Sequence, residues 1–215
     1  KNEVVPALGC TEPISMALAS AIACKHLGST PERIEGKVSA NLMKNGMGVT
    51  VPETGMVGLQ IAAAVGALGG DPDSGLEVLR KLTPEIVEAG KRMLRENKVT
   101  VEITDVPHVL YAEARVSKGQ HWVRVCIADA HTHVVRIEKD GQIEFEADTL
   151  GGNEEAAFSL NSSTAHDVYE FATTAPLSDI LFILEAAKLN SRLSQEGMSG
   201  NYGLHGRSLL RWYII

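Results

Sequence analysis

Apolar residues recur every three or four positions near the start of the chain. This spacing predicts a helix over residues 11–27, because it gathers the apolar side chains on one face. Pro13 suits the first turn, where no backbone donor is needed, and Gly28 suits the C-terminal stop. Thr11 is predicted to cap the helix with its hydroxyl. The chain is therefore expected to begin with a buried helix.

The spacing of apolar residues predicts helices, strands and connecting segments in the rest of the chain. Helical spacing returns at 56–68, 74–81, 84–96, 165–173 and 176–193, and Thr83 with Pro84 predicts the start of the third of these helices. Alternation of apolar and polar residues predicts a short strand within 32–40 and an antiparallel meander between 98 and 147. Glycine, asparagine and proline predict an ordered loop at 41–55, a linker at 150–163 and a glycine-rich turn region at 194–206.

These elements predict an α+β fold. A helical layer from both ends of the chain is expected to flank a central antiparallel β-rich module. The expected parts are a mostly helical N-terminal part at 1–97, the β module at 98–150, and a C-terminal helical part at 151–215.

Composition excludes several classes of protein. The formal net charge is −7 and basic residues form no stripe, so no nucleic-acid partner is expected. No run reaches the roughly 18 apolar residues that a membrane span needs. Three scattered cysteines do not suggest a disulfide framework, which indicates a reducing, cytoplasmic compartment. Because the chain lacks an initial Met and ends in RSLLRWYII, both natural ends are expected to be altered or missing.

The stretch GCTEP, residues 9–13, is the first candidate for chemistry. A cysteine ahead of a helix faces free amide hydrogens and the positive end of the helix dipole, which favour a thiolate and can hold a carboxylate. Cys10 then suits a nucleophile, base or metal ligand; equally, it suits a small buried hydrophobe. Cys24 and Cys126 are expected to pack in the core, and no local spacing completes a metal site.

Two other stretches carry polar candidates. Asn45 and Gly46 lie in a glycine-rich segment where backbone can approach a ligand, although the residues alone favour an irregular connection ahead of a helix. The segment contains no nucleotide-binding pattern. In the HTH stretch at 131–133, His131 remains open as a polar contributor, whereas His133 is expected to be an ordinary surface residue.

Four stretches together resemble one family. They are VVPALGCTEPISMALASAIA, VSANLMKNGMGVTVPETGMVGLQIAAAVGALGG, AHTHVVRIE and AKLNSRLSQEGMSGNYGLHG. They resemble the L-cysteine desulfidases, which are related to the α chain of iron–sulfur L-serine dehydratases. The resemblance implies elimination from L-cysteine or L-serine to pyruvate and ammonia without pyridoxal phosphate. It also implies a [4Fe–4S] cluster held by three cysteines, with one iron acting as a Lewis acid.

The resemblance assigns roles to individual residues. It implies that Cys10 is catalytic or a cluster ligand, and that Thr11, Asn45, Gly46 and His131 contact a small amino-acid substrate. Family members run to about twice this length, so the chain is expected to be an N-terminal portion without the complete cluster. It is expected to form homo-oligomers, and its own activity stays open. The alternative is a non-catalytic amino-acid-binding fragment, or a subunit that needs a partner half.

Overall fold

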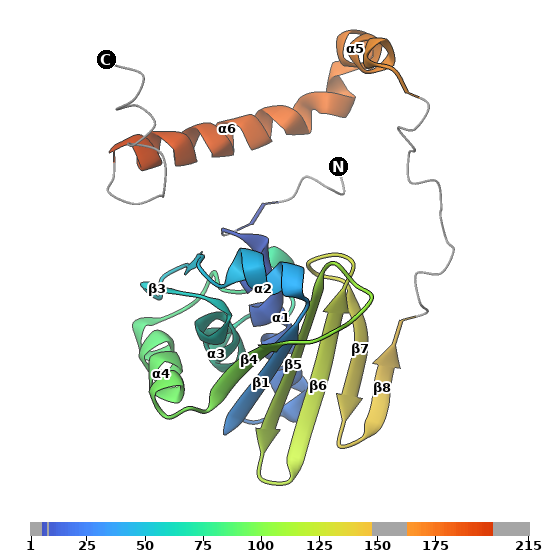
Figure 1. Ribbon diagram of the computed structural model, residues 1–215. Helices are drawn as coiled ribbons and strands as arrows, with labels where there is room; N and C mark the ends of the chain where they lie inside the picture. The colour runs from blue at the N-terminus through green and yellow to red at the C-terminus, as the bar shows by residue number, and fades with distance from the viewer. Residues whose placement is uncertain (1–5, 8, 148–162, 200–215) are drawn as a thin grey trace. The chain divides into compact units, whose positions relative to one another are not determined.

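The computed structural model describes residues 6–7, 9–147 and 163–199. Their contacts divide the chain into two units. One unit comprises Pro6–Gly152, and the other contains the last two helices. The predicted α+β class is confirmed, because helices pack beside a mixed sheet of six strands (Figure 1).

The first helix, α1 (Thr11–Leu27), matches the periodicity but not the predicted cap. Cys10 is the N-cap residue and makes no side-chain cap hydrogen bond. Thr11 already lies inside the helix, so its hydroxyl is directed elsewhere. The C-terminal prediction is confirmed: Gly28 has φ 72° and donates its N–H to the carbonyl of Cys24.

The main sheet has the strand order β4-β1-β5-β6-β7-β8. Its strands are β1 (Arg33–Val38), β4 (Val99–Ile103), β5 (Tyr111–Lys118), β6 (His121–Ala128), β7 (Val134–Lys139) and β8 (Gln142–Glu146). Strands β5 to β8 form the predicted antiparallel meander. However, β1 lies between β4 and β5, parallel to the first and antiparallel to the second, so the sheet is not formed by the 98–147 stretch alone.

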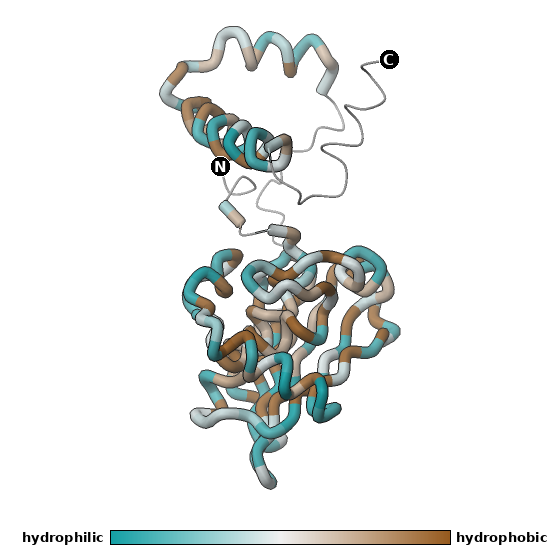
Figure 2. The backbone as a smooth tube through the Cα atoms, turned by 90° about the vertical axis from the view of Figure 1, so that its left-hand side faces the viewer, coloured by the Kyte–Doolittle hydropathy of each residue, from teal (hydrophilic) through white to brown (hydrophobic). Residues whose placement is uncertain are grey.

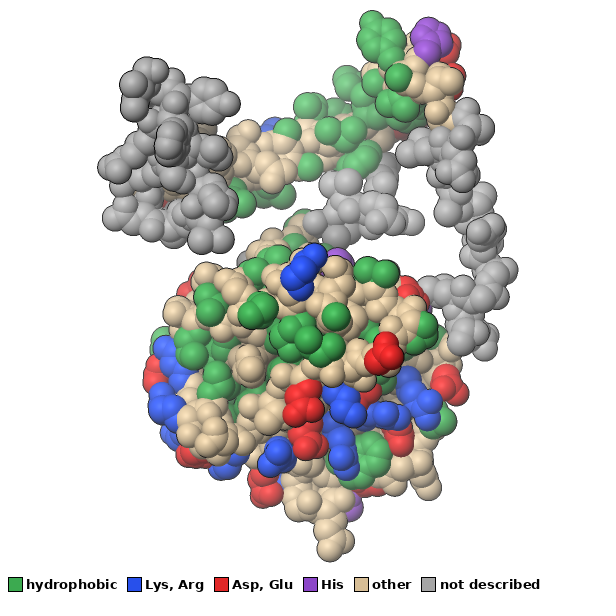
Figure 3. Space-filling view, viewed as in Figure 1, with side chains coloured by type: hydrophobic (Ala, Val, Ile, Leu, Met, Phe, Trp, Pro, Cys, Tyr) green, Lys and Arg blue, Asp and Glu red, His purple; other side chains and the backbone are tan. Residues whose placement is uncertain are grey.

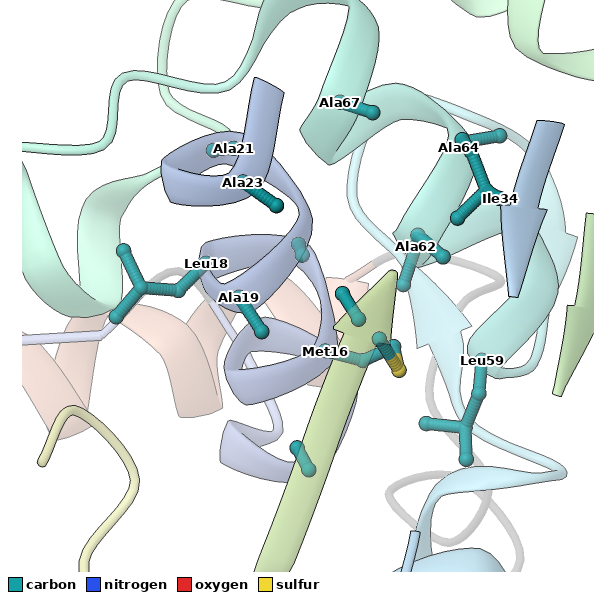
Figure 4. Packing of buried hydrophobic residues seen from close by; sticks show 14 of the residues in the cluster. Met16, Leu18, Ala19, Ala21, Ala23, Ile34, Leu59, Ala62, Ala64 and Ala67 are labelled. Atoms are coloured by element: carbon teal, nitrogen blue, oxygen red, sulfur yellow. The ribbon is translucent and has the colours of Figure 1, made fainter. Parts of the chain in front are cut away.

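The core lies between one face of this sheet and the helices α1 and α3 (Leu59–Gly69). Figure 4 shows side chains of both helices and of β1 filling this space. Alanine is frequent on α1 and α3, and small side chains let helices approach closely. The closest approach is at Gly66, where an added Cβ would lie 2.3 Å from the carbonyl oxygen of Ala17.

Three local predictions differ from the structure. The expected loop at 41–55 contains α2 (Ala40–Gly46), whose N-cap Ser39 accepts a hydrogen bond from the amide of Leu42. The same predicted loop also contains strand β2 (Thr50–Val51), which forms a hairpin with β3 (Met56–Val57). The expected helix at 74–81 shortens to the 3-10 turn η1 (Gly75–Glu77). Helix α4 (Pro84–Arg95) begins as predicted, with Thr83 as its cap.

The second unit contains α5 (Ala165–Thr174) and α6 (Leu177–Ser199). Helix α6 runs through part of the predicted glycine-rich turn, while residues 200–206 of that turn lie outside the described residues, as does most of the predicted linker. Figure 2 shows apolar and polar residues mixed along α6. No described residue of α5 or α6 is buried. Within the described parts of the chain, no helix has the length and apolar character required to cross a bilayer.

Candidate functional site

The N-terminus of α1 brings together most of the predicted site residues. Cys10 is exposed, and its thiol donates a hydrogen bond of 2.8 Å to Glu12 Oε2. The amide of Asn45, at the end of α2, donates to Glu12 Oε1 over 3.2 Å. Residues that are 33 positions apart in the sequence therefore meet on one carboxylate. Sequence reasoning placed Glu12 only in the first turn and did not recognise it as the centre of the cluster.

The environment of Cys10 opposes the predicted thiolate. Partial burial raises the pKa of the Cys10 thiol, and the hydrogen bond to the Glu12 carboxylate raises it further. The backbone amides of Glu12 and Thr11 lower this pKa, but they do not reverse the shift. The thiol of Cys10 therefore keeps its proton at neutral pH, because burial and the hydrogen bond to Glu12 together outweigh the backbone amides that lower its pKa.

Glu12 shows the complementary shift. Partial burial raises the pKa of its carboxyl, but the hydrogen bonds from Cys10, the Glu12 amide and Asn45 lower it, as does the charge of His131. The net pKa lies below the ordinary value for glutamate. The cluster thus presents a carboxylate at neutral pH, with a neutral thiol and a neutral amide bound to it.

His131 joins the site from the loop between β6 and β7. Its Nε2 shares a hydrogen bond of 3.0 Å with the hydroxyl of Thr11. Ser15, which is fully buried, donates its hydroxyl to the carbonyls of His131 and Thr11 at 2.9 and 3.1 Å. Ser15 was not recognised in the sequence, where it is one small residue of a buried helix. His133 lies apart and contacts the carbonyl of Ala128.

Gly46 has a packing role in this structure. A Cβ at this position would lie 2.6 Å from Leu59 Cδ2 and 3.5 Å from the Cβ of Glu12. Its missing side chain therefore allows the end of α2 to lie against α3 and the first turn of α1, which brings Asn45 within reach of Glu12.

The cysteines do not suit a shared metal cluster. Cys10 and Cys24 lie at opposite ends of α1, roughly 20 Å apart at 1.5 Å per residue. Cys126 is buried on β6, where it contacts Tyr111 and Glu113. Across the residues that the structure describes, no group of three or more His, Cys, Asp or Glu side chains is arranged to hold a metal ion. The described residues thus do not fit the implied [4Fe–4S] cluster.

The chain is similar to bacterial proteins that are about twice as long. A Chromobacterium violaceum protein is 59% identical over 212 residues, which cover 98% of this chain and 49% of the relative. These relatives are named UPF0597 proteins. A second relative, from Yersinia enterocolitica, is 55% identical and is matched over 98% of this chain and 49% of the relative. A third, from Dichelobacter nodosus, is 54% identical over 97% of this chain and 49% of the relative. No protein-family model and no solved structure matches the chain.

The UPF0597 relatives correct the family prediction. At 54–59% identity over nearly the whole chain, they carry a name that states neither a lyase activity nor an iron–sulfur cluster. The predicted membership of the L-cysteine desulfidase family is therefore wrong. The predictions that depended on it are wrong as well: the iron–sulfur elimination of L-cysteine or L-serine, the N-terminal portion of such an enzyme, and the alternative of a fragment or half-subunit of it. A small amino acid as the ligand stays a prediction. The chain spans about half the length of these relatives.

Proposed function

We propose that the cluster at the start of α1 binds a small free amino acid, with Glu12 accepting its ammonium group. The observation that carries this proposal is the Glu12 carboxylate, to which, among the described side chains, only the Cys10 thiol and the Asn45 amide donate hydrogen bonds. Both donors are neutral, and Glu12 forms no ion pair with any described residue. An ammonium group supplies the missing positive charge through charge-assisted hydrogen bonds.

The carboxylate of such a ligand has favourable partners beside Glu12. The side chain of the N-cap residue, Cys10, does not cap the backbone amides of the first turn of α1, and the dipole of this 17-residue helix favours negative charge there. The Thr11 hydroxyl and the His131 ring are paired with each other next to this turn. The exposed Cys10 thiol would lie beside the bound molecule, where its protonated state suits a hydrogen-bond donor better than a nucleophile.

Isothermal titration calorimetry of the full chain with L-serine and with L-cysteine tests the proposal. N-Acetyl-L-serine lacks the ammonium group and L-serinamide lacks the carboxylate, so both should bind at least tenfold more weakly than L-serine. Glu12→Gln should weaken L-serine about tenfold or more, because a hydrogen bond to a charged group contributes about 1.5–3 kcal/mol. Glu88→Gln is the matched control, since Glu88 pairs with Lys91 on α4. L-Serine and L-cysteine that do not bind, or that bind Glu12→Gln unchanged, would refute the proposal.

We also infer that the protein works in a reducing compartment such as the cytoplasm. All three cysteines are free thiols, and Cys126 is buried where it has no cysteine partner. Alkylation of the unreduced protein from its native cells, followed by peptide mass spectrometry, should label Cys10, Cys24 and Cys126 as free thiols, and a disulfide at any of them would contradict the inference.

A further inference from the structure

The two helices of the second unit, α5 and α6, expose most of their large apolar side chains. No described residue of either helix is buried. Ten of these side chains belong to residues that are between 43% and 68% exposed: Val168, Tyr169, Phe171, Leu177, Leu181, Ile183, Leu184, Leu189, Leu193 and Met198. Figure 3 shows hydrophobic side chains along the visible side of both helices. Helices gain most of their stability by burying an apolar face, so these helices need a partner surface.

One apolar stripe of α6 follows the spacing of a coiled coil. Its members recur at intervals of four, three and four residues: Phe182, Ala186, Leu189 and Leu193. In a seven-residue repeat these are d, a, d and a positions, which form the seam between two paired helices. The stripe is about 18 Å long at 1.5 Å per residue. Asp179 and Glu196 hold the next positions of the seam, so its apolar part ends at Phe182 and Leu193.

The charges beside the stripe fit a second copy of the same helix. Glu185 and Arg192 hold the g positions, which flank the seam and set the orientation of paired helices. An antiparallel pair matches each a position with a d position, so that Phe182 of one copy lies against Leu193 of the other. The same register places Glu185 opposite Arg192 of the second copy. In a parallel pair Glu185 would instead face the uncharged Asn190, and no opposite charges would meet across the seam.

The contacts that these two charges already make leave them available. Glu185 Oε1 pairs with Lys188 at 2.8 Å within α6, and the two side chains are 70% and 66% exposed. Such a surface pair contributes little, and the second carboxylate oxygen stays open to another donor. Arg192 is exposed and forms no ion pair within the part of the chain that the structure describes.

We propose that α6 pairs with α6 of a second copy of this chain. The two helices run antiparallel about a two-fold axis that passes beside residues 187 and 188, halfway along the stripe. The small side chain of Ala186 lets the helices approach closely near this axis. Two-fold symmetry makes the interface self-complementary, so the ion pair of Glu185 with Arg192 occurs twice. Opposite charges at both ends of the seam then select a second copy and its orientation.

Sedimentation velocity of the full chain at low ionic strength tests the pairing. The wild type should form dimers whose fraction rises with concentration. Glu185→Arg brings two arginines together across the seam, and Arg192→Glu brings two glutamates together. Because each substitution acts twice, each variant alone should dimerise at least tenfold more weakly. Lys188→Glu is the matched control, since it reverses a charge of the same helix at the outward c position, and it should change dimerisation less than about threefold.

A mixture of the two weakened variants gives the decisive measurement. When Glu185→Arg and Arg192→Glu are mixed in equal amounts, the new arginine of one copy faces the new glutamate of the other. The native Arg192 and Glu185 also face each other, so the mixture should recover the dimerisation of the wild type. Two different chains are needed for this recovery, so neither misfolding nor a change within one chain can produce it.

Three results would each overturn the proposal. The first is a wild type that stays monomeric at every concentration, which would show that the stripe has another occupant. The second is a pair of variants that dimerise as well as the wild type. The third is a mixture that stays as weakly associated as its two components. Glu12 lies in the other unit, so this proposal and the proposed binding of an amino acid can fail separately.

Discussion

Gly66→Ala tests whether the close backbone contact between α3 and α1 stabilises the unit Pro6–Gly152. The added methyl would lie 2.3, 2.6 and 2.8 Å from the O, Cα and C atoms of Ala17. These are backbone atoms, so no rotamer change relieves the contact, and the two helices must move apart. Overpacking in a core typically costs about 1–3 kcal/mol, and the higher helix propensity of alanine returns about 1 kcal/mol. With a contact this short, we expect a net loss of about 2 kcal/mol.

Urea unfolding followed by near-ultraviolet circular dichroism measures this loss. Gly90→Ala is the matched control, because it also adds a methyl to a buried helical glycine of the same unit. There the nearest atom is a side-chain methyl, Val65 Cγ1 at 3.0 Å, which can shift by a few tenths of an ångström. The control should change the free energy of unfolding by less than about 1 kcal/mol. If Gly66→Ala is as stable as the wild type, or Gly90→Ala is the more damaging change, the reasoning about backbone contact is refuted.

Two further predictions concern the cluster at the start of α1. Glu12→Gln removes the negative charge that helps raise the pKa of the Cys10 thiol. The pH midpoint of iodoacetamide labelling at Cys10, followed by peptide mass spectrometry, should therefore move to lower pH. An unchanged midpoint would show that Glu12 does not act on the thiol. Ser15→Ala removes the donor to two carbonyls of the site and should cost about 1–2 kcal/mol in urea unfolding. Ser20→Ala, which removes a bond only to the Met16 carbonyl within α1, should cost less, and equal losses would contradict a special role for Ser15.

The local pattern of apolar and polar residues predicted most helices and strands, but not which of them lie side by side in the fold. The periodicity of 11–27 and the Thr83 cap carried enough information to place α1 and the start of α4. The missed helix α2 is seven residues long, contains asparagine and glycine, and is stabilised by its Ser39 cap and by Leu42 in the core. Its helical state depends on tertiary contacts, which a propensity argument does not include.

The sequence did not predict the contacts that bring the candidate residues together. Cys10, Thr11, Asn45 and His131 do lie together, but no spacing rule connects positions 11 and 131. The error at Cys10 arose from treating the helix dipole alone. Burial of the thiol and its hydrogen bond to the Glu12 carboxylate together outweigh the backbone amides at the helix N-terminus, and the sequence shows neither the burial nor which way Glu12 turns.

Strand β1, from the first third of the chain, pairs with two strands from the middle of the chain. Each of its edges is already occupied, by β4 on one side and β5 on the other. A polypeptide cut between residues 97 and 98 would therefore leave both products with unpaired backbone groups, which recruit other strands. The two pieces should aggregate when made separately and recover solubility when made in one cell, because only together do they supply β1 with both of its neighbours.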